Sequence, residues 1–470
     1  MTEFAADHTV SKGKEQVAQQ GSEDVMEEFA LKRVPDHYRS TKASLSAMFG
    51  VPMCMYYLAV GSLSVALAGF WMGLLATLLA YGVFIIFTST FGYVSWKGGY
   101  SFDMITRFSW GKMGSFLPSL LGTYLLMSFW AMETYWIAVA LKTVWPGIHI
   151  WVFYIILFPV FVLIPLYGYR AMAKFNYIAI PVGVLATIYA FIYFYGIREF
   201  EVTGIVEMTR KPMIPGGFGV ALDWSLAAVG LWALVAGDFG RFIQREHKGW
   251  ARGFGPLMGG LCHILFPIAG IFIVFPMIAE LTPKIGAQQA GMAAISASVP
   301  FVIAMGLLGA LVVVTYQLHV QFINVYLPSV NLANFFSVIF KIEPGRKWWV
   351  VLVNLAGLGL LAIGIINWIT QWAWVAGLTL GTACIISISD MAYRSYRKMK
   401  TDYDELPANM REVNPIAFVV FVIAVAVGVM DKLWWHVSPS PSVIAYPLAF
   451  VLYWILSAAA DGKYQHDVAA

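Results

Sequence analysis

The sequence predicts an all-α polytopic membrane protein with twelve transmembrane helices. Of its 470 residues 60% are hydrophobic, and only 12% are Asp, Glu, Lys or Arg. A soluble domain carries about 25% charged residues, so this chain could not cover a soluble surface with charge. The charges also divide the chain into apolar stretches of the length that a spanning helix needs, about 20 residues.

The charge-free stretches place the spans in order. No charged residue lies between Lys42 and Lys97, which leaves room for two spans joined near Gly69–Gly73. The stretch 348–389 has room for a second adjacent pair. We expect the flanks 286–298 and 329–340 to form short helices beside the eighth span. The twelve predicted spans are 44–68, 71–93, 115–141, 151–169, 175–197, 217–238, 253–279, 299–326, 348–366, 369–389, 414–430 and 442–460.

The distribution of Lys and Arg predicts that both termini are cytoplasmic and that the protein lies in the inner membrane of the cell. With the N-terminus inside, the inner loops hold seventeen Lys and Arg residues and the outer loops hold six. An excess of this kind marks cytoplasmic loops. We therefore expect a cytoplasmic tail at 1–43, a membrane domain at 44–460 and a cytoplasmic tail at 461–470. Because 1–43 has no apolar core, we expect no cleaved signal peptide.

The cysteines indicate neither a disulfide framework nor a metal site. Cys54, Cys262 and Cys384 are isolated from one another inside apolar stretches. We expect no cofactor and no nucleic-acid partner, and the sequence leaves the oligomeric state open. The lipid bilayer is the one large partner that the composition implies.

Helix-breaking residues indicate where a binding site lies. The first span contains Gly50–Pro52, and proline removes a backbone donor and clashes with the preceding turn. The sixth span contains Gly230 and Gly237. Interrupted helices at matching positions of two halves are typical of inverted-repeat transporters, which bind substrate between the repeats. The alternative is that these glycines are kinks or close-packing points. The predicted parts are a first repeat at 44–197, a second repeat at 217–389 and two additional helices at 414–460.

An acidic residue lies inside the third span. Glu133 is surrounded in sequence by the aromatic residues of Phe129–Trp136. Such an acid can hold a cation or a proton, or accept hydrogen bonds from an N–H-rich ligand. Burying it in lipid is costly, so it favours a functional role. The alternative is a structural acid that is hydrogen-bonded to a neighbouring helix.

The eighth span holds the densest group of polar residues, Thr315–Gln321. Gln317 and Gln321 share one helix face, and their amides could read the polar edge of a planar heterocycle. His319 shares the neighbouring face with Thr315 and Tyr316 and is a candidate proton carrier. The alternatives are hydrogen bonds that join helices, as in other membrane proteins, and a buried neutral histidine.

Other polar residues have simpler interpretations. We interpret His263 as structural. Asp238 with Arg241, and Asp390 with Arg394, are spaced as ion pairs at helix ends. The segment 367–372 is either a gate or part of an interfacial aromatic belt. The sequence has no nucleophile–base pair or paired carboxylates that would indicate an enzyme, and no filter-like glycine repeat that would indicate a channel.

Several motifs resemble those of a known family of transporters. The most specific is the loop Thr106–Gly111, which reads Thr-Arg-Phe-Ser-Trp-Gly. With the other motifs, the sequence over 44–460 resembles the nucleobase:cation symporter-1 family, and most closely its bacterial cytosine and purine permease branch. The resemblance implies a LeuT-like five-plus-five inverted repeat and import of a planar N-heterocycle together with a cation. The other motifs are Phe87–Tyr93, Phe116–Leu120, Gly237–Phe242, Leu332–Asn334 and Asp390 with the basic residues after it.

The presumed pocket departs from the pattern of that branch. The stacking tryptophan of the third span falls on Phe129, and a glutamine one turn earlier falls on Leu126. An asparagine of the eighth span falls on Gln321. The hydroxyl pair of the family's sodium site falls on His319 and Val320, which cannot supply the same oxygen ligands. We therefore expect coupling to H+ in preference to Na+.

These arguments give a set of candidate site residues. The small-molecule substrate is a nucleobase such as cytosine or a purine, or a related compound, and the partner ion is the coupling cation. The alternative is a small organic cation or amine, held by Glu133 and the aromatic residues around it. No metal site is predicted with any specificity. The substrate-binding candidates are Phe129, Glu133, Trp232, Gln317 and Gln321. The cation-coupling candidates are Glu133, His319, Thr315, Tyr316 and the backbone of Cys54.

Overall fold

The computed structural model describes residues 29–399 and 410–460, and all regular secondary structure in this part of the chain is helical. Of the predicted tails, 1–43 and 461–470, residues 1–28 and 461–470 lie outside the described residues. The helices are α2 Thr41–Gly50, α3 Met55–Ala68, α4 Phe70–Gly98, α5 Phe102–Trp110, α6 Phe116–Val144, α7 Ile150–Leu166, α8 Gly168–Phe191, α9 Val202–Met208, α10 Gly217–Leu226, α11 Val229–Gly240, α12 Lys248–Gly260, α13 Phe266–Ile285, α14 Ala287–Met292, α15 Val299–Met305, α16 Leu307–Ile339, α17 Arg346–Ala362, α18 Ile369–Tyr396, α19 Pro415–Met430 and α20 Pro441–Ala459.

The helices confirm a polytopic membrane fold. Within the described residues, 10 helical segments are long and apolar enough to cross a membrane, and each overlaps a predicted span. The other two predicted spans coincide with α7 and α17, which have 17 residues each. A helix of that length measures about 25 Å, slightly less than the hydrocarbon thickness of about 30 Å. The count of twelve spans therefore stays a prediction.

The eighth span differs from its predicted bounds. The predicted flank 286–298 does form short helices, but α15 ends at Met305, and the next residue, Gly306, has a φ of 60° that is readily adopted only by glycine. The spanning helix then starts at Leu307 and continues without interruption to Ile339. The predicted separate helix at 329–340 is wrong, because Pro328 lies within α16 without ending it.

The helix break in the first span is confirmed. Helix α2 ends at Gly50, a 3₁₀ turn covers Val51–Met53, and Cys54 is extended with φ −101° and ψ 161°. Helix α3 then begins at Met55. The first turn of α3 therefore leaves backbone N–H groups in the middle of the protein that need partners.

The break in the sixth span lies earlier than predicted. It falls at Ala227–Ala228, between α10 and α11, whereas Gly230 and Gly237 are both inside α11. A Cβ at Gly230 would lie 2.8 Å from Cγ of Leu380, and one at Gly237 would lie 2.9 Å from Cβ of Phe102. These two glycines are thus close-packing points, and the placement of the break at them was wrong.

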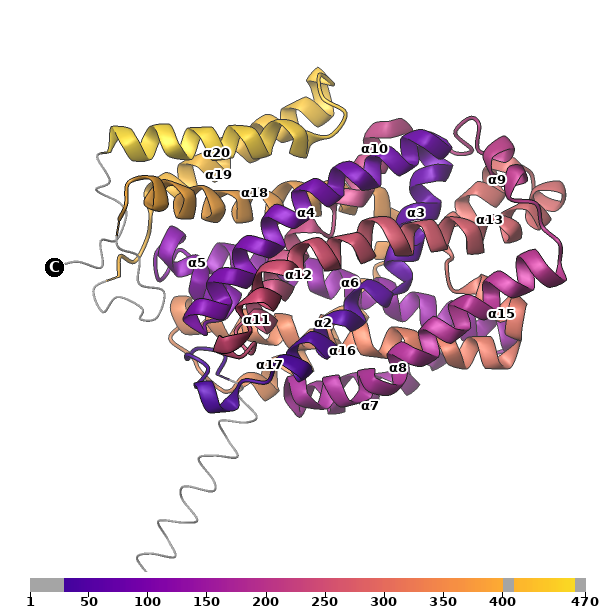
Figure 1. Cartoon of the computed structure of the whole chain (residues 1–470), viewed down its shortest axis with the longest axis horizontal. Helices are drawn as coiled ribbons and strands as arrows, with labels where there is room; N and C mark the ends of the chain where they lie inside the picture. Colours follow the sequence, from indigo (N-terminus) through magenta and orange to yellow (C-terminus); the bar gives the residue numbers. More distant parts are fainter. Residues whose placement is uncertain (1–28, 400–409, 461–470) are drawn as a thin grey trace, which may run out of the picture.

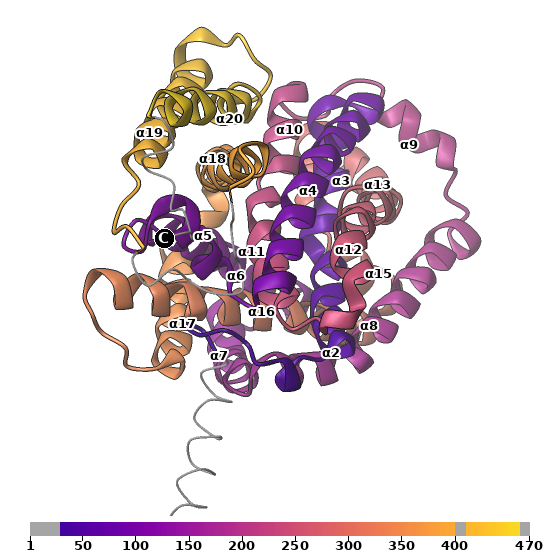
Figure 2. The ribbon, with the colours of Figure 1, turned by 60° about the vertical axis from the view of Figure 1, so that its left-hand side comes forward.

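The long helices pack side by side around a common centre (Figure 1). Helix α6 lies along α16, and α4 lies along α11 and α12. Helix α3 lies against α10 and α13. Helices α19 and α20 pack on α18 at one side of the molecule (Figure 2). The halves of the two broken spans therefore lie among α4, α6, α8, α13, α16 and α18.

The segment before α2 lies across one end of the molecule, the end predicted to be cytoplasmic. The Val34 N–H donates to Gly99 O at 2.9 Å, and the Ser40 N–H donates to Phe242 O at 2.8 Å. Arg241 donates to Phe29 O at 2.8 Å. Residues 29–40 therefore connect the end of α4 to the end of α11, and we call them the N-terminal strap.

Candidate functional site

Four aromatic side chains from four helices meet beside the two helix breaks. The Tyr56 ring on α3 lies 4.8 Å from the Phe129 ring on α6 and 4.8 Å from the Trp224 ring on α10, as centroid distances. The Phe129 ring lies 5.1 Å from that of Trp372 on α18, at an interplanar angle of 88°. All four side chains are buried. We call these four residues the aromatic cluster.

Glu133 extends this cluster along the same face of α6, one turn after Phe129. It is completely buried, and its Oε2 accepts a hydrogen bond from Nε2 of Gln317 on α16. The Gln317 Oε1 in turn accepts the Met55 N–H, at the start of α3, at 2.9 Å. Gln317 thus joins the carboxyl group of Glu133 to the N-terminus of a half-helix, where partial positive charge favours an anion.

Two polar atoms at this site have no partner in the described part of the chain. One is Oε1 of Glu133, and the other is the indole Nε1 of Trp372. Buried polar groups are nearly always hydrogen-bonded, and an unsatisfied one costs about 1–3 kcal/mol. A ligand that donates to Glu133 and accepts from Trp372 would satisfy both atoms.

His319 on α16 lies against the break in the first span. Its Nε2 contacts the Gly50 carbonyl oxygen, the last one of α2. A carbonyl oxygen can only accept, so the Nε2 of His319 carries the proton in this contact. The imidazole N–H therefore engages the backbone oxygen at the end of α2.

The remaining cation-coupling candidates are Tyr316, Thr315 and the backbone of Cys54, and they do not form one cluster with His319. Tyr316 lies beside His319, with 6.0 Å between the ring centroids, and its hydroxyl has no partner among the described residues. Thr315 is partly exposed and donates to Leu311 O of its own helix at 3.0 Å. The Cys54 carbonyl accepts the Tyr57 N–H at 3.2 Å. The structure thus brings Tyr316 to His319 and pairs the Thr315 hydroxyl within its own helix.

Gln321 connects two helices. Its Nε2 donates to Trp130 O at 2.9 Å and to Thr134 Oγ1 at 2.5 Å, both on α6. Its Oε1 accepts from Asn324 at 3.0 Å. With both amide atoms engaged, Gln321 acts in this conformation as a link between α16 and α6, which is the alternative interpretation of its sequence position.

Trp232 lies in a different cluster from Phe129. Its indole N–H donates to the Tyr57 hydroxyl, and its ring packs 5.0 Å from that of Phe84 on α4. His263 borders the same group, 5.1 Å from the Phe84 ring, and neither of its nitrogens has a partner in the described part of the chain. The tryptophan of the sixth span that joins the aromatic cluster is Trp224. Trp232 lies on α11, after the break, and Trp224 lies on α10, before it.

Sequence reasoning missed three members of the aromatic cluster: Tyr56, Trp224 and Trp372. Tyr56 directly follows the first break, and this position was an available signal. Trp372 belongs to the segment that was interpreted as a gate or an aromatic belt. Trp224 had no local signal, since its role depends on where α10 ends.

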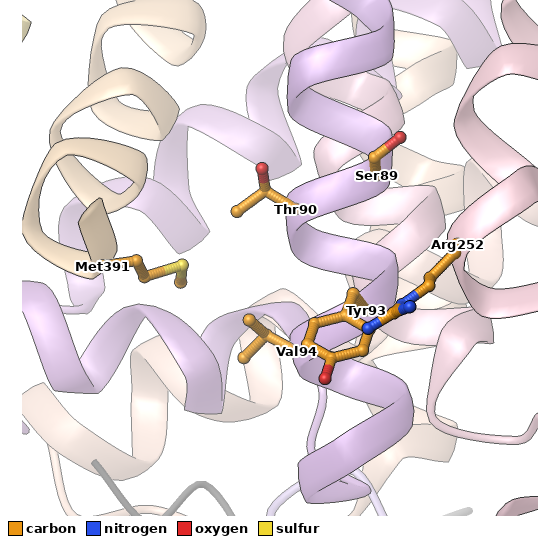
Figure 3. Close-up of a pocket in the computed structure, with 6 residues that line it drawn as sticks. All are labelled: Ser89, Thr90, Tyr93, Val94, Arg252 and Met391. Atoms are coloured by element: carbon orange, nitrogen blue, oxygen red, sulfur yellow. The ribbon is translucent and has the colours of Figure 1, made fainter. Parts of the chain in front are cut away.

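A hollow of about 430 Å³ lies apart from these residues, among α4, α12 and α18 (Figure 3). The Arg252 guanidinium lies over the Tyr93 ring at 5.3 Å from its centroid. None of the aromatic cluster contributes to this hollow, so it is not part of the central site. It is lined by Ser89, Thr90, Tyr93, Val94, Arg252 and Met391.

The sequence matches a known family of membrane proteins. Residues 33–456 match the profile of a family described as permeases for cytosine/purines, uracil, thiamine and allantoin. The chain belongs to this permease family. The resemblance to nucleobase:cation symporters is thereby confirmed, and the permease is a membrane transporter by both family and fold. Among curated protein sequences, none matches the permease.

Solved structures show the same fold. The permease is similar to Mhp1, a nucleobase-cation-symport-1 family transporter, in a closed conformation with bromovinylhydantoin bound: the TM-score is 0.69 at 18% identity over 92% of this chain and 95% of that chain. The inward-facing conformation of Mhp1 gives a TM-score of 0.68 at 18% identity, over 92% of this chain and 93% of that chain. A Na+-coupled sialic acid symporter gives 0.60 at 14% identity, over 93% and 94% of the chains. The LeuT-like class predicted for the permease is thereby confirmed.

Proposed function

We propose that this permease imports a small planar N-heterocycle, a nucleobase such as cytosine or a purine or a related compound, together with a proton. The observation that carries the proposal is the pair of unsatisfied atoms, Glu133 Oε1 and Trp372 Nε1, beside the aromatic cluster. Planar heterocycles offer a π-face for aromatic side chains and N–H and carbonyl groups along one edge. Transport proceeds by alternating access between the two repeats, with both termini in the cytoplasm of an inner-membrane protein.

The residues next to the break between α2 and α3 have different roles in substrate binding. Phe129 and the other rings of the aromatic cluster cover the ligand, while Glu133 accepts from its N–H group. Gln317 holds Glu133 in place and joins it to α3. Substrate binding is thereby coupled to the position of the half-helix, because the same amide contacts both.

Coupling to a proton is supported by the contact of His319 with Gly50. A sodium ion needs several oxygen ligands, and here an imidazole already occupies one carbonyl of the broken helix. Glu133, the other candidate, has one carboxyl oxygen available for a proton or a ligand N–H. Protonation of these two groups follows the switch between outward-facing and inward-facing states.

A second candidate function is transport of a small organic cation. The observation in its favour is the same carboxyl group among aromatic rings, an arrangement that also binds ammonium groups. A thermal-shift screen of nucleobases, vitamins and amines on the purified protein separates the two. Stabilisation by a nucleobase that a quaternary amine does not displace supports the heterocycle. Stabilisation by amines alone would favour the cation transporter.

We expect Trp372→Phe to weaken substrate binding about tenfold, because phenylalanine keeps the ring but removes the N–H donor; one lost hydrogen bond to a ligand is worth about 1–2 kcal/mol. The measurement is the dissociation constant of the substrate identified by the screen. Trp454→Phe is the matched control, since its indole N–H is also buried without a partner but lies on α20, outside the aromatic cluster. Equal affinities in the two variants would remove Trp372 from the site.

A further inference from the structure

Two aspartates outside the aromatic cluster are buried together at the end covered by the N-terminal strap. Asp103 belongs to the short helix α5, and Asp238 belongs to the last turn of α11. Both side chains have 0% exposure. Phe102, the neighbour of Asp103, donates its N–H to Asp238 Oδ1 at 3.4 Å, so the two residues meet across the interface of α5 and α11.

Each aspartate has one oxygen with a partner and one without. Asp103 Oδ1 accepts from the Ser119 hydroxyl on α6 at 2.6 Å. The Oδ2 atoms of both aspartates have no hydrogen-bond partner in the part of the chain that the structure describes. Two buried carboxylate oxygens without donors are hard to maintain in the ionised form.

The nearby cations are largely committed to other acceptors. Arg241 approaches Asp238 Oδ1 only to 4.0 Å, while it donates to Asp238 O at 3.0 Å and to Phe29 O at 2.8 Å. Arg107 donates to the Asn334 side chain on α16 at 2.5 and 3.2 Å. On α18, Asp390 is paired with Arg394 at 2.8 Å.

The other elements packed against the two aspartates contribute neutral groups or distant charges. Asn334 donates to Ser115 and Ser119, and Ser95 on α4 donates to Gly237 O. Glu343 and Glu412 act on Arg107 from the loops. Arg107 and Arg241 therefore offset part of the charge of the two carboxyl groups, but neither donates to an Oδ2 atom.

We propose that Asp103 and Asp238 together bind one proton, and that this shared proton holds the end of α11 against α5. A proton on one carboxyl group removes the repulsion between them and supplies the missing donor. When α11 separates from α5, water reaches both groups and the proton leaves on the cytoplasmic side. The pair is thus a second protonation site of the transporter, distinct from Glu133 and His319.

The pH dependence of this closure has a definite sign. Burial and the negative charge of Asp238 raise the pKa of Asp103 to about 8. In the open, hydrated state the pKa of an aspartate is about 3.9. The proton therefore stabilises the closed state fully below about pH 3.9, and this stabilisation decreases as the pH rises and is lost above about pH 8.

A cysteine at Asn331 reports on the opening. The Asn331 side chain is buried on α16, and a Cβ at Gly122 of α6 would lie 2.7 Å from both Asn331 Nδ2 and Cδ2 of Leu234 on α11. The position is therefore exposed only when α11 moves away from α6 and α16. The native Cys54, Cys262 and Cys384 are buried and are replaced by alanine in the background protein.

The experiment compares labelling of Asn331→Cys by a membrane-impermeant maleimide on inside-out vesicles, with and without Asp103→Asn. Thiol reactivity rises with pH in every variant. The quantity compared is therefore the labelling rate of the protein with Asp103 divided by the rate of the Asp103→Asn variant at the same pH. We expect a ratio near one at about pH 4 that rises by up to about tenfold per pH unit between about pH 4 and pH 8 and levels off above about pH 8. The asparagine variant stays closed, because its amide is neutral and carries a donor.

Further variants keep the test decisive. Asp238→Asn should also label slowly at every pH and serves if Asp103→Asn fails to fold. Glu133→Gln should leave the ratio unchanged, so a failure of the proposed substrate coupling remains distinguishable from a failure of this site. The proposal would be overturned if the labelling rate with both aspartates, divided by the rate of either asparagine variant, did not vary with pH. Reclosure by sodium at fixed pH would also overturn it, because the site would then bind a metal cation.

Discussion

Glu133→Gln should abolish substrate accumulation driven by a pH gradient, weaken substrate binding, and leave exchange of substrate across the membrane measurable at saturating substrate. The amide oxygen can still accept from Gln317, but the amide nitrogen then replaces the oxygen that accepts from the ligand, and the side chain cannot take up a proton. In exchange the carrier returns with substrate bound, so no net proton movement is needed. Accumulation requires net proton movement. The measurement compares gradient-driven uptake with counterflow of labelled substrate in the same proteoliposomes.

The matched control for this variant is Glu280→Gln. Glu280 is an exposed acid on α13, paired with Arg198 at 2.7 Å, and it is not a member of the aromatic cluster. We expect it to retain both activities. If Glu133→Gln accumulated substrate as well as the control did, Glu133 would have no role in coupling.

Gly50→Ala should reduce the rate of transport at least about tenfold. A Cβ at Gly50 would lie 2.6 Å from Nδ2 of Asn176 and 2.7 Å from Cδ2 of His319. Overpacking at such a site typically costs about 1–3 kcal/mol. The added methyl must displace the imidazole from the Gly50 carbonyl or distort the break itself, and the initial rate of uptake measures the effect.

Gly82→Ala provides a control on a spanning helix, since a Cβ there has no atom within 4 Å. We expect wild-type uptake from this variant. Wild-type uptake from Gly50→Ala, at equal amounts of folded protein, would show that the contact between His319 and Gly50 is dispensable.

The sequence predicted those parts of the fold that depend on local composition. Apolar length located the helices, and Pro52 located the first break, because a proline inside a helix acts on its own backbone. The second break has no such residue. Its position at Ala227–Ala228 depends on packing with neighbouring helices, so the sequence could not choose between Trp224 and Trp232.

The candidate site was also predicted only where a local sequence signal exists. The polar residues buried in spans, Glu133 and Gln317, were identifiable because lipid excludes them, and the structure brings them into contact. Gln321 has the same sequence signature but joins two helices. The pairing of Asp103 with Asp238 joins residues far apart in the chain, and only the packing of α5 on α11 reveals it.

The most direct test of proton-coupled heterocycle import is uptake of a labelled nucleobase into proteoliposomes that hold the wild-type protein. The nucleobase is the one that gives the largest thermal shift. One set of vesicles has a pH gradient, acid outside, without sodium; the other has a sodium gradient at equal pH on both sides. The account predicts accumulation above the external concentration in the first set only. Accumulation that requires the sodium gradient and ignores the pH gradient would contradict it.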